Sequence, residues 1–182
     1  MDIYNDIAAK AMSNIFNKNP CGFQNNVIPH LLKMLTSSIP KQPVLMVQPT
    51  GAGKSAVPLT VAVVDGGITV IIENTLALGT DQATKTELIA QSTNRRYIKS
   101  IHLDSIKIHK QQQALSSSIL HHCSKNKDTS IIIFTSPETL LKPVWINFIL
   151  QCHKNRILNL ICIDKIHMFV EFGCTFRPKF QH

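Results

Sequence analysis

Gln48-Pro49-Thr50-Gly51-Ala52-Gly53-Lys54-Ser55 is the stretch that decides the fold class of this chain. It follows an apolar run, Val44-Leu45-Met46-Val47, which we expect to be a strand, and it precedes a segment that can be helical. This order is typical of a phosphate-binding loop, because glycines let several backbone N–H groups point at one anion and the helix adds its positive dipole end. The pattern G-x-x-x-x-G-K-[ST] is matched except at its first position, where Gln48 replaces Gly.

The loop predicts a site for a nucleoside triphosphate and its magnesium ion. Lys54 is expected to reach the β- and γ-phosphates, and the Ser55 hydroxyl to hold Mg²⁺. The expected nucleotide contacts within the loop are Thr50, Gly51, Ala52, Gly53, Lys54 and Ser55. A glycine-rich turn before a helix, without a ligand, is the alternative, and the order of strand, loop and helix favours the phosphate site.

Composition and charge indicate a globular chain with a polyanionic partner. The 182 residues suffice for one domain, and 44% are apolar and 16% charged, which excludes a disordered chain. The formal net charge is +8, which favours nucleic acid as the partner, with a generally basic surface as the alternative.

Cysteine spacing and hydropathy bear on the compartment. None of the five cysteines forms a Cys-x-x-Cys pair, so we expect reduced thiols and no zinc site. No apolar run reaches the roughly 18 residues that span a bilayer, and the polar N-terminus does not look like a signal peptide. We therefore expect a nuclear or cytoplasmic protein that is not secreted.

Hydrophobic periodicity predicts alternating helices and strands. Helices are expected at 3–17, 23–35, 54–64, 76–91, 108–123 and 138–153, and strands at 44–47, 68–72, 98–103, 130–134 and 158–163. This alternation predicts an α/β fold in which helices cover both faces of a mostly parallel sheet. Ligands bind such sheets beyond the carboxyl ends of the strands, where the phosphate loop and Asp164 both fall.

A second motif follows the last predicted strand and indicates a protein family. Asp164-Lys165-Ile166-His167 stands where phosphate-loop enzymes keep the acid that holds Mg²⁺. The aromatic stretch Phe172-Gly173 and Phe176-Arg177-Pro178 comes soon after. On these residues the chain resembles the first RecA-like lobe of RecQ-family DNA helicases of superfamily 2, over about residues 12–180. The resemblance implies a three-layer RecA-like P-loop NTPase domain, with N-terminal helices at about 3–36 and a nucleotide-binding core at about 43–182.

The resemblance also implies roles for individual residues. Lys54, Asp164 and His167 take the place of catalytic residues, and Asp164 joins Ser55 in holding Mg²⁺. Gln24 stands where the family keeps a glutamine that reads adenine. The implied nucleic-acid contacts are Asp81, Gln82, Thr135, Ser136, Phe172, Phe176 and Arg177. The implied cofactors are ATP and Mg²⁺, the implied partner is DNA (single-stranded or at a duplex junction), and the implied activity is 3′-to-5′ unwinding in recombination and repair.

Departures from the family pattern limit the expected activity. Lys165 stands in place of the glutamate that activates the attacking water, and losing a general base typically costs about 10²–10⁴ in rate. We therefore expect ATP–Mg²⁺ binding with poor hydrolysis. Phe172 replaces a tryptophan, and Glu73-Asn74 stands where the family often has Ser-Pro. A carboxylate at position 73 would repel a nearby phosphate backbone.

Three functional interpretations remain open at this point. The chain is expected to hold one helicase lobe without the second, which makes it a fragment or decayed copy of a RecQ-type helicase. Alternatively, it is a binding module that retains ATP and DNA but performs no chemistry. A small kinase or GTPase is the third, and the lack of arginines in a recognisable lid argues against it.

Overall fold

A four-stranded sheet forms the centre of the fold, and all of its strand pairs are parallel. The computed structural model describes residues 3–38, 41–73, 86, 97–126 and 129–165. The strands of the described part are β1 (Gly67–Ile72), β2 (Tyr97–His102), β3 (Thr129–Thr135) and β4 (Leu158–Ile163). Their spatial order is β2-β3-β1-β4, so the carboxyl ends of the four strands share one edge.

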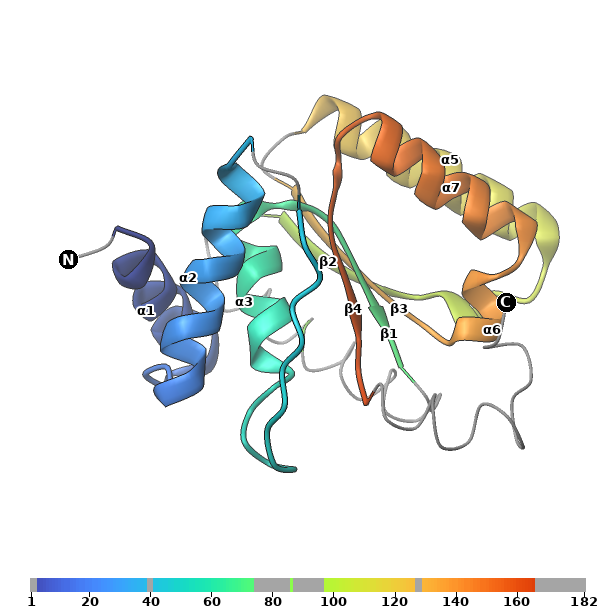
Figure 1. The fold of residues 1–182 in the computed structure, drawn as a ribbon. Coiled ribbons are helices and arrows are strands. Elements are labelled where there is room, and N and C mark those ends of the chain that lie inside the picture. Colours follow the sequence, from blue (N-terminus) through green and yellow to red (C-terminus); the bar gives the residue numbers. More distant parts are fainter. Residues whose placement is uncertain (1–2, 39–40, 74–85, 87–96, 127–128, 166–182) are drawn as a thin grey trace.

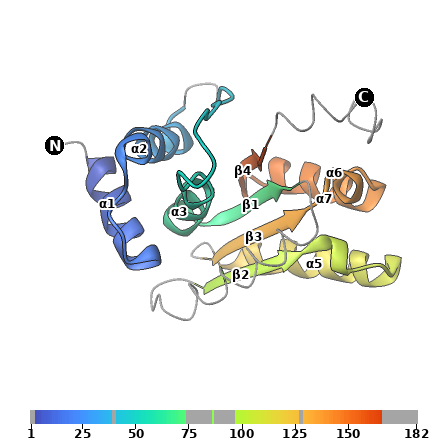
Figure 2. The same ribbon diagram turned by 90° about the horizontal axis from the view of Figure 1, so that it is seen from below.

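Helices cover both faces of this sheet (Figures 1 and 2). One face carries α3 (Ala56–Asp65), which is backed by α1 (Ile3–Phe16) and α2 (Gly22–Thr36). The other face carries α5 (His109–Lys125) and α7 (Pro143–Lys154). Two short elements, η1 (Leu103–Ser105) and α6 (Pro137–Leu140), follow β2 and β3. The three-layer α/β fold with a parallel sheet is confirmed.

Alternation along β3 divides the core between the two helix layers. Ile131 and Ile133 pack toward α5 and α7, while Ile132 and Phe134 pack toward α3. Every residue of β3 is buried, as expected for a central strand covered on both faces. Full burial of each such side chain contributes about 1.5–3 kcal/mol to the stability of the fold. The apolar run of β3 therefore stabilises the centre of the sheet.

The predicted strand at 44–47 is wrong for the described structure. The segment joins no strand ladder, and Leu45 and Val47 are 72% and 80% exposed. Only Met46 packs inward, against the cluster that includes Leu160 of β4. Pro43 and Pro49, which lack N–H donors, flank the run on either side.

The predicted helix at 138–153 is also corrected, because the structure has two helices there. The first, α6, ends at Leu140, and α7 begins at Pro143. Proline cannot continue a helix, but it suits a first turn, so Pro143 ends one element and begins the next. The predicted helix at 76–91 lies outside the described residues except for Thr86.

Candidate functional site

The loop before α3 has the shape that its glycines predict. Gly51 and Gly53 adopt φ angles of 82° and 85°, which side chains disfavour, and Ala52 N donates to Pro49 O at 3.3 Å. Ser55 is the residue that precedes α3, and its hydroxyl makes no capping hydrogen bond. The loop therefore makes a tight turn, and the Ser55 hydroxyl, which does not cap the helix, lies at the start of α3.

Lys54 lies back over this loop. Its Nζ donates to the carbonyl oxygens of Gln48 and Pro49, both at 2.9 Å. The two carbonyls hold the ammonium against the loop that the sequence assigns to phosphates. A triphosphate would exchange these two neutral acceptors for charged oxygens, which form the stronger type of hydrogen bond.

Gln24 of α2 braces the loop from outside the sheet. Its Nε2 donates to Gly53 O at 2.9 Å, and its Oε1 accepts from Cys21 N at 2.9 Å. The side chain is 5% exposed, and a Cβ built on Gly53 would lie 2.8 Å from Nε2. The resemblance predicts a base contact for Gln24, whereas the structure shows a loop contact. One N–H and one oxygen lone pair of the amide are left for a ligand.

Asp164 lies at the carboxyl end of β4. Its N–H donates to Ile72 O at 2.9 Å, which continues the pairing of β4 with β1 beyond the last strand residue. Lys165 follows with φ 56°, a left-handed conformation that costs a non-glycine residue about 1–2 kcal/mol. The loop before α3 and the ends of β1 and β4 lie toward the same end of the molecule (Figure 1).

Glu73 is a functional candidate that sequence reasoning treated only as a departure. It follows β1, is 2% exposed, and neither carboxylate oxygen has a hydrogen-bond partner among the described residues. Burial, with a further contribution from the charge of Asp164, raises its pKa to about 7, and the charge of Lys165 opposes that rise. The only sequence signal was an acidic residue directly after a buried strand.

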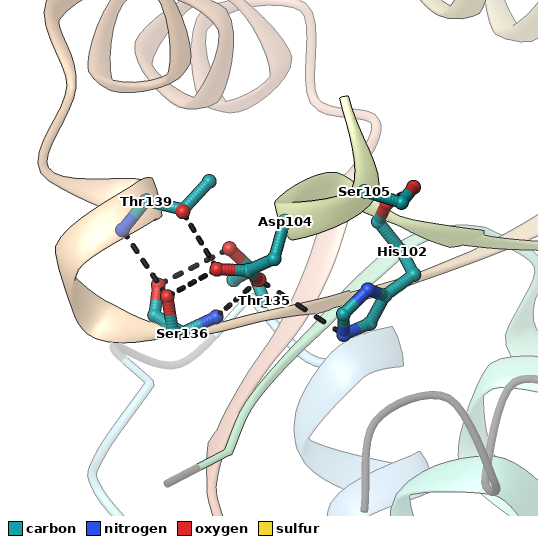
Figure 3. Close-up of polar contacts among 6 residues, drawn as sticks. All are labelled: His102, Asp104, Ser105, Thr135, Ser136 and Thr139. Atoms are coloured by element: carbon teal, nitrogen blue, oxygen red, sulfur yellow. Dashed lines mark hydrogen bonds and ion pairs between the residues drawn. The ribbon is translucent and has the colours of Figure 1, made fainter. Parts of the chain in front are cut away.

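Asp104 of η1 organises the turn after β3 (Figure 3). Its carboxylate accepts from Ser136 N at 2.8 Å, from the Ser136 hydroxyl, and from Thr139 Oγ1 at 2.6 Å. His102 Nε2 lies 4.0 Å from the same carboxylate. Burial raises the pKa of Asp104, but the hydrogen bonds from Ser136 and Thr139 outweigh it, so the net pKa lies below its ordinary value.

This cluster engages polar groups of the turn that the resemblance assigns to nucleic acid. The resemblance assigns Thr135 and Ser136 to nucleic acid, yet Thr135 is buried and its hydroxyl donates to Ser136 O at 3.1 Å. The Ser136 hydroxyl and N–H are both engaged by Asp104. Sequence reasoning missed Asp104, which the structure identifies as the residue that fixes the orientation of this turn.

The remaining predicted contacts lie outside the described residues: Asp81, Gln82, His167, Phe172, Phe176 and Arg177. In the described ranges, no group of three or more His, Cys, Asp or Glu side chains is placed to hold a metal ion. No helix within those ranges has the length and apolar character needed to cross a membrane.

A parallel sheet between two helix layers, with this loop at the start of α3 and Asp164 directly after β4, defines a RecA-like P-loop NTPase domain. The chain belongs to the DEAD/DEAH box helicase family, whose sequence model matches residues 21–182. It is thus a helicase-like protein, and the resemblance to RecQ helicases is confirmed by two curated relatives.

Both relatives are much longer than this chain. The ATP-dependent DNA helicase RecQ of Synechocystis sp. is 30% identical over 138 residues, which are 75% of this chain and 26% of that protein. The ATP-dependent DNA helicase Q1 of Rattus norvegicus is 20% identical over 162 residues, which are 84% of this chain and 23% of that protein. The chain thus spans about a quarter of the length of either relative.

Proposed function

We propose that this chain is the ATP-binding and nucleic-acid-binding lobe of a RecQ-type DNA helicase. The observation that carries the proposal is the curled loop at the start of α3, with Lys54 folded over it. The family match and the similarity to two DNA helicases support ATP as the nucleotide and DNA as the polymer.

The donor set at the carboxyl edge of the sheet suits a nucleotide with its magnesium ion. Lys54 would bind the β- and γ-phosphates, while the Ser55 hydroxyl and the Asp164 carboxylate would hold Mg²⁺, which prefers oxygen ligands. The ion would neutralise phosphate charge when bound. Gln24 would fix the loop through Gly53 and use its remaining N–H and lone pair on the adenine edge.

Nucleotide binding is tested with a fluorescent ATP analogue and the purified chain. Lys54→Ala should weaken binding at least about tenfold, because a charge-assisted contact to phosphate contributes about 1.5–3 kcal/mol. Lys41→Ala is the matched control, since Lys41 is exposed and lies outside the loop. Equal affinities of the two variants would overturn the assignment of the loop.

Nucleic-acid binding is supported by the net charge of +8 and by the family match. Affinity for single-stranded DNA should fall steeply with salt, because binding to phosphates releases counterions with a slope of about −0.7 per contact. Fluorescence anisotropy across a salt series measures that slope. Binding that is absent or insensitive to salt would contradict this part of the proposal.

Lys165 favours a second candidate function, in which the lobe binds ATP and DNA without hydrolysis. A charged lysine cannot accept the proton of an attacking water, so the usual base of the family is missing at this position. A steady-state ATPase assay with single-stranded DNA separates the two functions. Turnover near about one per second or faster, within the range typical of enzymes, would exclude the second.

A further inference from the structure

Two carboxylates lie side by side where β1 and β4 end. Ile72 pairs with Ile163 in register, and the N–H of Asp164 donates to Ile72 O at 2.9 Å. Glu73 and Asp164 are therefore the next register pair of two adjacent parallel strands. In such a pair the side chains project from the same face of the sheet.

That face is the one covered by α3. Ile71 and Cys162, each two residues before a carboxylate, belong to the cluster packed on α3. Since side chains alternate along a strand, Glu73 and Asp164 project toward the same layer. Burial, with smaller contributions from the charges of Asp164 and Glu73, raises the pKa of Cys162 to about 12, which agrees with both acids lying near this thiol.

Glu73 has no described group that satisfies it. Its side chain is 2% exposed, and both oxygens lack hydrogen-bond partners in the described part of the chain. A buried carboxylate is costly unless it is paired, hydrogen-bonded or bound to a metal. The like charge of Asp164 beside it adds to that cost, so a cation bound here would stabilise both carboxylates.

We propose that Glu73 and Asp164 together form a divalent-cation site at the ends of β1 and β4, in which Glu73 is the second protein carboxylate. Mg²⁺ and Mn²⁺ take carboxylate oxygens, and such ions are commonly held by one or two carboxylates plus waters and phosphate oxygens. Two protein ligands agree with the lack of any larger ligand cluster among the described residues. The ammonium of Lys165 would compete with the cation for these carboxylates.

The inference rests on the proposed function only in taking Asp164 as a cation ligand. The test therefore uses Mn²⁺ alone, without nucleotide, on the purified chain at about pH 8. Electron paramagnetic resonance of the free ion measures the bound fraction. We expect one saturable site, and both Glu73→Gln and Asp164→Asn should weaken it at least about tenfold, since each removes a charged ligand. Asp6→Asn, at an exposed position of α1, should leave the affinity unchanged.

Absence of saturable Mn²⁺ binding to the unaltered chain would overturn the site, as would equal affinities of E73Q and the unaltered chain. If E73Q loses its cooperative melting transition, Mn²⁺ binding is measured with Glu73→Asp instead. This variant keeps the carboxylate, but its side chain is one methylene shorter. Weaker Mn²⁺ binding by folded E73D supports the site, and unchanged binding overturns it. Binding of the ATP analogue in EDTA tests the phosphate loop separately. A negative result for Mn²⁺ binding therefore does not affect the conclusion about nucleotide binding, and the reverse also holds.

Discussion

The side-chain amide of Gln24 donates a hydrogen bond to the carbonyl oxygen of Gly53, 2.9 Å away. The contact joins α2, which lies outside the sheet, to the loop that precedes α3. Gln24 is held in turn by Cys21 N, so the position of the loop depends on the start of α2. The loop is thus braced by a helix that makes no direct part of the phosphate cradle.

Gly53→Ala should weaken nucleotide binding more than any other single glycine change in this region. The new methyl would meet Gln24 Nε2 at 2.8 Å and would sit on a backbone with φ 85°. The left-handed conformation alone costs about 1–2 kcal/mol, and displacement of the buried amide adds the loss of a hydrogen bond of about 1 kcal/mol. Titration with a fluorescent ATP analogue measures the effect.

Substitutions at two other glycines separate the effect of backbone strain from the effect of displacing Gln24. Gly51→Ala would place a side chain on a backbone with φ 82°, but the new methyl would meet no atom within 4 Å. It should therefore weaken nucleotide binding by an intermediate amount. Gly22→Ala also meets nothing and has no such φ, so it should bind nucleotide as the unaltered chain does. A different order of the three affinities would contradict the bracing role of Gln24.

Periodicity and loop chemistry were enough to predict the layers of this fold. The expected strand at 158–163 has the bounds of β4, and the positive φ angles of Gly51 and Gly53 follow from the phosphate-loop pattern. The prediction of a strand at 44–47 failed because it rested on apolar character alone, whereas in the described structure Leu45 and Val47 are exposed and the run pairs with no strand. Pro143 divided a single predicted helix.

The candidate site was less predictable, because its key contacts join residues far apart in the sequence. Asp104 lies 32 residues before Ser136, and only the order of strands in the sheet brings the two together. Glu73 and Asp164 become neighbours through the pairing of β1 with β4. A motif indicates the type of residue at one position, whereas these pairs depend on register.

Asp104→Asn should lower the free energy of unfolding by about 1–3 kcal/mol near neutral pH, because it weakens charge-assisted bonds to a buried turn. The folded pKa of Asp104 lies below its ordinary value of 3.8, so its ionised form stabilises the fold above that value. This stability is lost as pH falls through the folded pKa. Urea unfolding followed by fluorescence of the buried Trp145, the chain's single tryptophan, measures both.

The difference between D104N and the unaltered chain should therefore shrink at acid pH. Asp6→Asn is the control, because Asp6 is exposed on α1. A difference in unfolding free energy that stays constant from about pH 7 to about pH 3 would show that the ionisation of Asp104 does not stabilise the turn.

Glu73→Gln should stabilise the chain at about pH 8 in EDTA. The folded pKa of about 7 exceeds the ordinary 4.5, so the folded state holds the proton more tightly than the unfolded state does. Stability is then lost as pH rises from 4.5 to about 7, by up to about 3 kcal/mol, and glutamine avoids this loss. Thermal melts at several pH values test it, and equal melting temperatures of the two proteins at alkaline pH would contradict it.

Lys165→Glu should raise ATP turnover, by up to the 10²–10⁴ that a general base typically contributes. The new carboxylate would join Glu73 and Asp164 and would replace the positive charge of Lys165, which lowers the pKa of Glu73. DNA-stimulated phosphate release measures the rates, with K54A/K165E as the inactive control. Equal rates in K165E and the unaltered chain would show that Lys165 does not limit hydrolysis.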